Sequence, residues 1–425
     1  MFGAAGLVII AKLIGLVSQI ALASKLGVSA ISDAYFLVLL VPTLLCNVLG
    51  GAVGLATVGS IVNPSRIRNA NAILLLKSFL FVAPVLVLLT LFRSQIAQLF
   101  ITEVDAPAKI VAFSKLSLVF WPLTCFMCVS QIALVWQNAI GKLMLPALSP
   151  LSYAMVLLAM VGFDLFDSVE ELLINAQMLG VFLELAIVLL SAWRQGLLQF
   201  DKQSFVSAWP NVVLLKTSVV QNAFSWFILS LSAPIEQYFS SLQGPGVNTL
   251  IGFTGRIVIP LCAILGSALT LVALKFLLEI HGLGATKKYW RRCLNAAFLV
   301  YLAGTVVSFA LSFFSDLLIG FIYRGPSFAA NDIVLIGHLF SLLVYLLPAQ
   351  LVIMFSYRVF SISGHGRYQL YLVLGSLFVL VCGIHLLPAL RPGENIVLSS
   401  LIANHLLAVA YLFLAFEFMR RARGP

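Results

Sequence analysis

The feature that most constrains this chain is its succession of long apolar runs, each close to the length of a membrane span. A spanning helix needs about 20 mostly apolar residues. Twelve runs of this kind follow one another, near residues 4–23, 34–58, 72–92, 115–137, 146–163, 176–193, 212–232, 247–275, 294–314, 334–357, 369–388 and 397–418. The chain is 62% hydrophobic and 9% charged, whereas soluble domains are about 45–50% apolar and about 25% charged. The sequence therefore excludes a water-soluble enzyme and predicts an all-α polytopic membrane protein with about 12 transmembrane helices.

The basic residues between these runs predict the orientation of the chain. Loops on the cytoplasmic side of a membrane protein carry an excess of Lys and Arg. With a cytoplasmic N-terminus, 14 basic residues fall in inner loops and the C-terminal tail, and only five fall in outer loops, namely Lys25, Arg93, Lys109, Arg324 and Arg391. We therefore expect a multi-pass membrane protein with both termini cytoplasmic. The net charge of +10 then reflects orientation, and nucleic acid is not an expected partner.

A weak internal repeat indicates two halves. FRSQIAQLF leads into a run with Pro122, and Gly141 and Lys142 follow it. In the second half FSDLLIGFI leads into a run with Pro348, and Gly366 and Arg367 follow at a similar spacing. Transporter folds are often built from duplicated halves that move against each other. We therefore expect two six-helix lobes, residues 1–200 and 201–425, around a central cavity.

Two cations lie deep inside predicted spans and are candidates for binding a substrate. Ionisable groups within the hydrocarbon are costly and mark functional sites by default. Lys12 lies near the middle of the first run, and Arg256 lies four residues before Pro260 in the eighth. Their alternative role is to pair with a buried acid. Four other cations lie near helix ends, where they can reach the headgroups and anchor the helices: Lys77, Lys115, Lys216 and Lys275.

Acids and amides in the spans add further candidates. Asp33 begins a helix in the segment SDAY, where capping of that helix is the alternative to a gating or coupling role. Glu236 follows Pro234 and is expected either to pair with Arg256 or Lys216 or to bind a coupling cation. Asn47 is a third candidate substrate-binding residue, although amides in spans more often hydrogen-bond between helices.

No arrangement for catalysis is found in the sequence. It contains no HExxH, GxSxG or phosphate-binding P-loop, and its five histidines are too widely spaced for a metal site. Cys125 and Cys128 have the spacing of a redox motif but lie in an apolar run, so a buried structural role is expected. We therefore expect no enzyme activity, no cofactor and no metal site. Transport would draw on an ion gradient, with Na⁺ or H⁺ as the coupling ion, or on the gradient of the substrate.

Several segments together resemble one family. LGVSAISDAYFLVLLVPTLL is similar to the first hairpin of the MviN/MurJ family, the bacterial lipid II flippases of the multidrug/oligosaccharidyl-lipid/polysaccharide (MOP) exporter superfamily. WQNAIGKLMLPALSPLSYAM, PIEQYFSSLQGPGVNTLIGFTGRIVIPLCAILGSAL and IYRGPSFAANDIVL resemble later stretches of the same family. The matches run in the family's order over about residues 10–370.

This resemblance implies a two-lobed transporter whose cavity accepts the pyrophosphate and sugar head of a polyprenyl-linked precursor. By the resemblance, Lys12 takes the place of a cavity arginine, Asp33 that of the acid after the first loop, and Arg256 that of the arginine of the second lobe. The chain departs from the family at Ser18, at Cys46 or Asn47, and at residues 50–52, where Gly-Gly-Ala replaces an expected alanine-glutamate-glycine. Fewer cations therefore remain than in the family, and fourteen spans are common there against the twelve expected here.

On this resemblance we interpret the sequence as that of a bacterial inner-membrane flippase for an anionic lipid-linked oligosaccharide in peptidoglycan biosynthesis or polysaccharide export. Lys12, Arg256 and Asn47 would bind the substrate, and Asp33 and Glu236 would serve in gating or coupling. Two alternatives stay open. One is a small-molecule or cation antiporter of the multidrug type, which would depend on buried carboxylates. The other is a membrane scaffold that transports nothing, for which neutralising Lys12 or Arg256 would have no effect.

Overall fold

The computed structural model describes residues 2–49, 68–101, 107–139, 144–198, 224, 227–228, 230–281, 287–324, 327–362, 367–388 and 391–422. These residues form helices joined by short loops, with no strand among them. Their contacts divide the chain into two compact units. The N-terminal unit is Met1–Pro234 with Gly244–Gly246, and the C-terminal unit is Ile235–Gln243 with Val247–Pro425. The expected lobe boundary at residues 200–201 lies outside the described residues.

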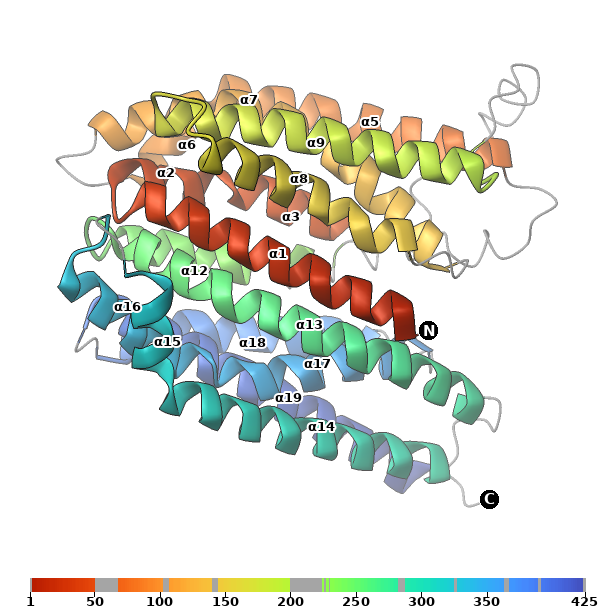
Figure 1. Ribbon diagram of the computed structural model, residues 1–425. Coiled ribbons are helices and arrows are strands. Elements are labelled where there is room, and N and C mark those ends of the chain that lie inside the picture. The colour runs from red at the N-terminus through yellow and green to blue at the C-terminus, as the bar shows by residue number, and fades with distance from the viewer. Residues whose placement is uncertain are drawn as a thin grey trace. The chain divides into compact units, whose positions relative to one another are not determined.

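The N-terminal unit is a bundle of long helices that run side by side (Figure 1). Its helices are α1 (Phe2–Leu26), α2 (Ala30–Val38), α3 (Leu40–Leu49), α5 (Arg68–Leu91), α6 (Arg93–Phe100), α7 (Pro107–Ala139), α8 (Met144–Gly162) and α9 (Val169–Arg194). Helix α7 is central, because α2, α3, α5 and α9 all pack on it, while α8 joins α1 to α9. Buried side chains of α7 include Trp121, whose indole N–H donates to the Val38 carbonyl at 3.1 Å.

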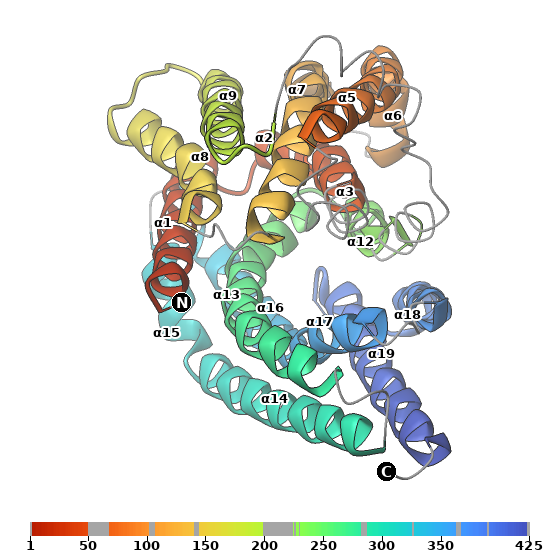
Figure 2. The same cartoon turned by 90° about the vertical axis from the view of Figure 1, so that its right-hand side faces the viewer.

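The C-terminal unit has the same character. Its helices are α12 (Ser232–Ser241), α13 (Val247–His281), α14 (Lys287–Phe313), α15 (Ser315–Ile322), α16 (Ala330–Leu343), α17 (Leu346–Ile362), α18 (Arg367–Leu386) and α19 (Glu394–Arg421). Helix α19 packs against α14, α16, α17 and α18, and α13 packs against α16 and α17 (Figure 2).

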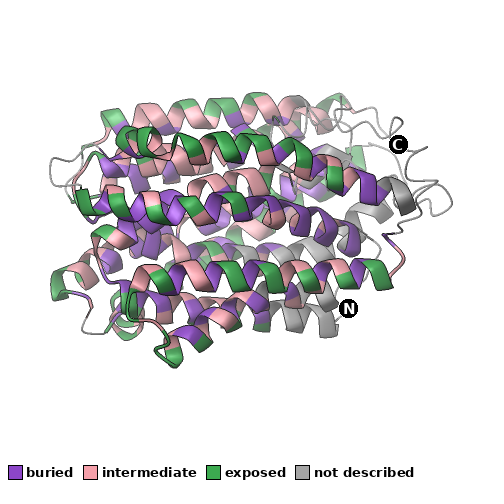
Figure 3. Ribbon diagram, turned by 90° about the horizontal axis from the view of Figure 1, so that it is seen from above, coloured by how far each residue is buried: buried purple, intermediate pink, exposed green. Residues whose placement is uncertain are grey.

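Helix α14 shows why these apolar sequences fold as membrane helices. Its exposed face carries large apolar side chains, among them Phe298, Leu302 and Phe309. Its buried face carries small residues such as Gly304 and Ser308, which let neighbouring backbones approach. Exposed and buried residues alternate along the helices in the same way elsewhere (Figure 3). An apolar outer face over a partly polar inner face suits a bilayer and not water.

The all-α polytopic architecture is confirmed. Within the described ranges, eight helices are long and apolar enough to cross a membrane, and the bent pair α16–α17 makes a ninth. Helices α1 and α8 coincide with two more of the expected spans, and the seventh, at 212–232, lies mostly outside the described residues. The fourth span begins earlier than expected, because its helix starts at Pro107 instead of near residue 115.

The internal repeat is also visible in the fold. FRSQIAQLF and FSDLLIGFI each form a short helix, α6 and α15, directly after a long one. The residue before each has nearly the same backbone conformation, with φ −91° and ψ 14° at Phe92 and φ −95° and ψ 13° at Phe314. The prolines differ in position, because Pro122 lies inside α7, whereas Pro348 lies in the first turn of α17, after the 42° bend that separates α16 from α17. The similar motifs therefore reflect similar local structures in the two units.

Candidate functional site

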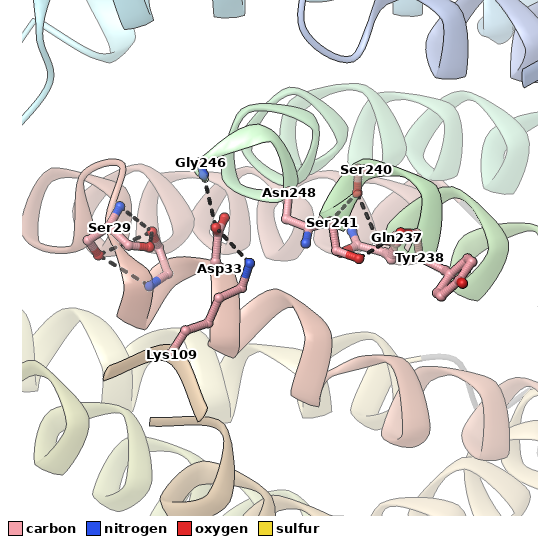
Figure 4. Close-up of polar contacts among 10 residues, drawn as sticks. Ser29, Asp33, Lys109, Gln237, Tyr238, Ser240, Ser241, Gly246 and Asn248 are labelled. Carbon is pink, nitrogen blue, oxygen red and sulfur yellow. Dashed lines mark hydrogen bonds and ion pairs between the residues drawn. The ribbon is translucent and has the colours of Figure 1, made fainter. Parts of the chain in front are cut away.

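Asp33 is a buried member of an ion pair and does not cap its helix. Ser29 caps α2, since its hydroxyl accepts the Ser32 N–H at 3.2 Å while the Ser32 hydroxyl accepts the Ser29 N–H at 2.9 Å. The Asp33 carboxylate is left to make tertiary contacts, with Lys109 Nζ at 3.2 Å and with the Gly246 N–H at 3.0 Å (Figure 4). The side chains of Asp33 and Lys109 are 3% and 4% exposed.

The burial of Lys109 corrects the sequence interpretation, which counted this residue in an outer loop. Helix α7 begins at Pro107, so Lys109 lies in its first turn. Proline is favoured at the first position of a helix, and this signal could have extended the fourth span. Since a buried charge is tolerated only when paired, the two side chains hold each other in place. Lys109 is one of the five cations expected in outer loops, but it lies buried in a helix and pairs with Asp33.

Gly246 supplies the backbone donor, and only glycine suits the position. Its φ is +83°, in the left-handed region that side chains disfavour. A Cβ atom added there would lie 2.7 Å from Cγ1 of Val28, inside van der Waals contact. Glycine therefore permits both the turn and the approach of the N–H to Asp33.

Two exposed ion pairs flank this buried one in the N-terminal unit. Lys25 contacts Asp164 at 2.7 Å, and Lys115 contacts Glu170 at 2.7 Å. Lys115, expected to anchor its helix at the headgroups, is exposed and pairs with an acid from the neighbouring helix α9. Exposed pairs of this kind contribute only about 0–1 kcal/mol each to stability. The buried pair Asp33–Lys109 is therefore the one whose loss should matter most among these three.

Lys12 and Asn47 are available to a ligand. Lys12 is half-buried on α1 and Asn47 is exposed on α3. Within the part of the chain that the structure describes, neither side chain has a hydrogen bond or an ion pair with protein. An amine within a span that is not matched by an acid is costly, and a bound anion would offset that cost.

Glu236 lies in a chain of polar side chains in the C-terminal unit. The Ser400 side chain hydrogen-bonds to its carboxylate. Asn404 donates to the Ser400 carbonyl at 2.8 Å, and Gln350 donates to the Asn404 side-chain oxygen at 2.8 Å. These contacts link α12, α17 and α19. Glu236 forms no ion pair with Arg256 among the described residues, and Lys216 lies outside them.

Arg256 lies beside a group of aromatic residues that sequence reasoning missed. It is half-buried on α13 and interacts electrostatically with Tyr323. The Tyr323 hydroxyl donates to the Phe253 carbonyl at 3.1 Å, one turn before Arg256. The rings of Phe253, Tyr323 and Phe328 lie 5.0 to 5.7 Å apart. The segment IYRGPSF, singled out by its resemblance, contributes two of these rings.

The loop between α12 and α13 is held to the start of α19. Gln243 accepts the Gly393 N–H at 2.8 Å and donates to Asn395 at 2.7 Å. Ser240 also bonds to Asn248 across the α12–α13 turn (Figure 4). These bonds hold in place the part of the loop that precedes Gly246 in the chain.

The structure thus gives Asp33 and Glu236 defined partners but assigns the candidate cations to different units. Lys12 belongs to the N-terminal unit and Arg256 to the C-terminal unit. Their role in one substrate site stays a prediction. Among the described residues no group of three or more His, Cys, Asp and Glu is placed to hold a metal ion.

Comparisons with known proteins agree on the fold. The sequence matches no protein-family profile and no curated protein. Among solved structures, it is similar to the lipid II flippase MurJ in an inward closed conformation, with 15% identity over 98% of this chain and 88% of that chain and a TM-score of 0.77. It is also similar to an inward-facing multidrug resistance MATE transporter of the MOP superfamily, with 12% identity over 97% and 95% of the two chains and a TM-score of 0.72.

A mutant of the Vibrio cholerae MATE transporter VcmN gives 14% identity over 99% of this chain and 97% of that chain, with a TM-score of 0.69. The resemblance drawn from the sequence is therefore confirmed at the level of the fold. The likeness extends to both a flippase and multidrug transporters, so it does not by itself separate their substrates. The chain therefore has the fold shared by these transporters.

Proposed function

We propose that this protein is a flippase that moves an anionic lipid-linked oligosaccharide across the bacterial inner membrane. The observation that carries the proposal is Lys12, a half-buried amine within a span that has no protein partner among the described residues. Arg256 offers a second half-buried cation, in the other unit. Phosphate groups are bound by such charge-assisted hydrogen bonds, which are strongest away from water.

The chemistry of the substrate follows from these groups. Lys12 and Arg256 are each cations of the kind from which a pyrophosphate accepts hydrogen bonds, and Asn47 can bind a sugar hydroxyl through its amide. The likeness to the flippase MurJ supports a polyprenyl-pyrophosphate carrier such as lipid II. The small number of cations also fits a lipid-linked unit of another polysaccharide. Cell-wall synthesis and polysaccharide export are the two processes that would use this transport.

Alternating access needs a contact that opens and closes, and the contact of Asp33 with Gly246 supports such a role. Its carboxylate accepts the N–H of Gly246, which directly precedes Val247, the first residue of α13. A hydrogen bond to a single backbone amide can break and re-form without refolding any helix. We assign Asp33 the role of a gate residue, with Lys109 holding its carboxylate in place.

Glu236 is the candidate coupling group. Its polar neighbours Ser400, Asn404 and Gln350 supply hydroxyl and amide oxygens within one unit. A carboxylate without a paired cation can take up either Na⁺ or H⁺. Ion uptake at Glu236 would alter the contacts of α12 with α19 and so couple an ion gradient to transport.

The same carboxylate favours the second candidate function, a small-molecule or cation antiporter. Two of the compared structures are multidrug transporters of the same fold. An antiporter of this kind would need Glu236 but would tolerate the loss of Lys12 and Arg256. The two functions therefore differ in which charge is essential.

Native mass spectrometry of the protein purified from bacterial membranes tests the proposal. Wild type is compared with Lys12→Ala, Arg256→Ala and the control Arg391→Ala, which removes an exposed arginine. We expect a polyprenyl-pyrophosphate lipid to co-purify with wild type and control and to fall about tenfold or more in the first two variants, since hydrogen bonds to charged groups contribute about 1.5–3 kcal/mol. Bulk phospholipid alone in every sample, or equal retention of the carrier lipid in both variants, would refute a lipid-linked substrate.

A further inference from the structure

One end of the C-terminal unit carries a concentrated positive charge that the proposed transport does not use. Helix α14 begins with Lys287, Lys288, Arg291 and Arg292, all exposed. Between them, Tyr289 and Trp290 are buried, with 0% and 2% exposure. The alternation fixes the helix face, because the aromatic pair turns inward and the four cations remain at the surface.

The end of α19 adds two more cations to the same place. Trp290 stacks on Phe418 with ring centroids 5.1 Å apart and an angle of 28° between the planes. Arg420 and Arg421 follow within one turn and are 70% and 73% exposed. Figures 1 and 2 both show the start of α14 beside the end of α19. We call the six residues the basic platform: Lys287, Lys288, Arg291, Arg292, Arg420 and Arg421.

A rigid aromatic core holds the two parts of the basic platform together. Trp290 also contacts Phe360 at 5.7 Å between ring centroids, and Phe360 contacts Phe418 at 6.0 Å. Tyr368 packs edge-on against Phe418 at 5.5 Å. These rings come from four helices, so the positions of the cations follow from the packed fold and not from the α14 sequence alone.

Within the described ranges, acids compensate little of the charge on the basic platform. The first turn of α14 contains no acid, although the N-terminal end of a helix repels cations. Lys287 and Arg291, and likewise Lys288 and Arg292, are like charges four residues apart, which destabilises a helix. None of these four forms an ion pair with any described residue, and Glu417 pairs with Arg420 and Arg421. Among the described residues, the six cations thus have a single carboxylate partner.

The platform lies at the boundary of the membrane. The apolar outer face of α14 begins at Phe298 and Leu299, which are 62% and 64% exposed. Arg292 precedes Phe298 by less than two helical turns, about 9 Å along the axis. When this apolar face lies in the hydrocarbon, the cations lie at the depth of the lipid headgroups.

We infer that the basic platform binds the headgroups of anionic phospholipids in the leaflet that it meets. Clusters of four to eight Lys and Arg at the end of a spanning helix are attracted to anionic lipids. The phosphates would neutralise the like charges of α14 and fix this end of the unit at the membrane surface. The platform contains neither Lys12 nor Arg256, and its binding of lipid does not depend on the nature of the transported substrate.

The test compares two variants that each remove two exposed arginines from the full-length protein. Arg291→Gln/Arg292→Gln changes the platform, and Arg324→Gln/Arg391→Gln removes the same charge from loops elsewhere. Detergent-purified proteins are titrated with phosphatidylglycerol or with phosphatidylcholine of the same acyl chains, and retained lipids are counted by native mass spectrometry. Inorganic phosphate at the same concentration is added in a further arm.

We expect wild type and the loop variant to retain phosphatidylglycerol in preference to phosphatidylcholine. In the platform variant this preference should fall by about fivefold per arginine. An equal preference in all three proteins would overturn the inference. So would complete displacement of phosphatidylglycerol by inorganic phosphate, because the platform would then bind any free anion. A second variant, Lys287→Gln/Lys288→Gln, should give the same loss, and a normal preference in it would also contradict the proposal.

Discussion

The side chains of Asp33 and Lys109 are almost fully buried. Losing one partner of this ion pair should therefore destabilise the protein more than losing a partner of any other ion pair between described residues. A buried pair gains little over an apolar substitute, but the loss of one partner leaves a charge in a medium that cannot solvate it. The exposed pair Lys25–Asp164 has the same short contact without that penalty. Burial, and not distance, separates the two pairs.

Replacing Lys109 with methionine should therefore destabilise the N-terminal unit strongly. We expect Lys109→Met to reduce the free energy of unfolding by about 3–5 kcal/mol, measured as a loss of thermal stability in detergent. The double variant Asp33→Asn/Lys109→Met should recover much of it, because no unpaired charge remains. Lys25→Met, at the exposed pair, is the control and should change stability by about 1 kcal/mol or less. Equal effects of Lys109→Met and Lys25→Met would show that the Asp33–Lys109 pair is not buried as described.

Among the helices, close packing depends on glycines that face a neighbouring backbone. Gly304 on α14 meets Pro348 on α17, where an added Cβ would lie 2.7 Å from the proline Cα. Gly375 on α18 has no atom within 4 Å of the same position. Glycines that face a neighbouring backbone, such as Gly304, set the distance between spans. Glycines that face open space, such as Gly375, do not.

These two glycines give a matched pair of substitutions. Gly304→Ala should separate α14 from α17 and reduce stability by about 1–3 kcal/mol, as overpacking does in other cores. Gly375→Ala should leave stability unchanged or raise it by up to about 1 kcal/mol, because alanine favours helix. Thermal unfolding of the purified variants measures both. If the two substitutions had the same effect, the close contact between α14 and α17 would be in doubt.

For the whole molecule, the basic residues argue for one orientation in the membrane. The end of α19 carries Arg420 and Arg421, and the loop after α8 carries Asp164. Positive charge is retained on the cytoplasmic side. The chain should therefore place residue 421 inside the cell and residue 164 outside.

Single cysteines at these two positions test that orientation. In intact inner-membrane spheroplasts, Asp164→Cys should react with a membrane-impermeant maleimide above the background of the native cysteines. Arg421→Cys should react only after permeabilisation. The reverse pattern would place both termini outside. Labelling of both positions in intact spheroplasts would mean that an even number of spans lies between them, instead of the seven expected from the sequence.

The periodic and compositional features of the sequence determined much of this architecture. Runs of about 20 apolar residues can satisfy their backbone in a bilayer only as helices, so the spans near 72–92, 294–314 and 397–418 agree closely with α5, α14 and α19. The similar phenylalanine-led segments likewise became the short helices α6 and α15. Local sequence is enough to predict the secondary structure where a bilayer permits only a helix.

Only the tertiary structure decided the partners of the charged side chains. Asp33 contacts Gly246 across 213 residues. Lys109, expected in a loop, lies in the first turn of a helix that begins at Pro107 and pairs with Asp33. Glu236 contacts Ser400. Such contacts depend on which helix faces pack together, and a period of 3.6 residues places a side chain on a face without naming the helix opposite. The sequence therefore determined that this chain crosses a membrane and which of its charges are costly, and packing determined which of those charges are paired.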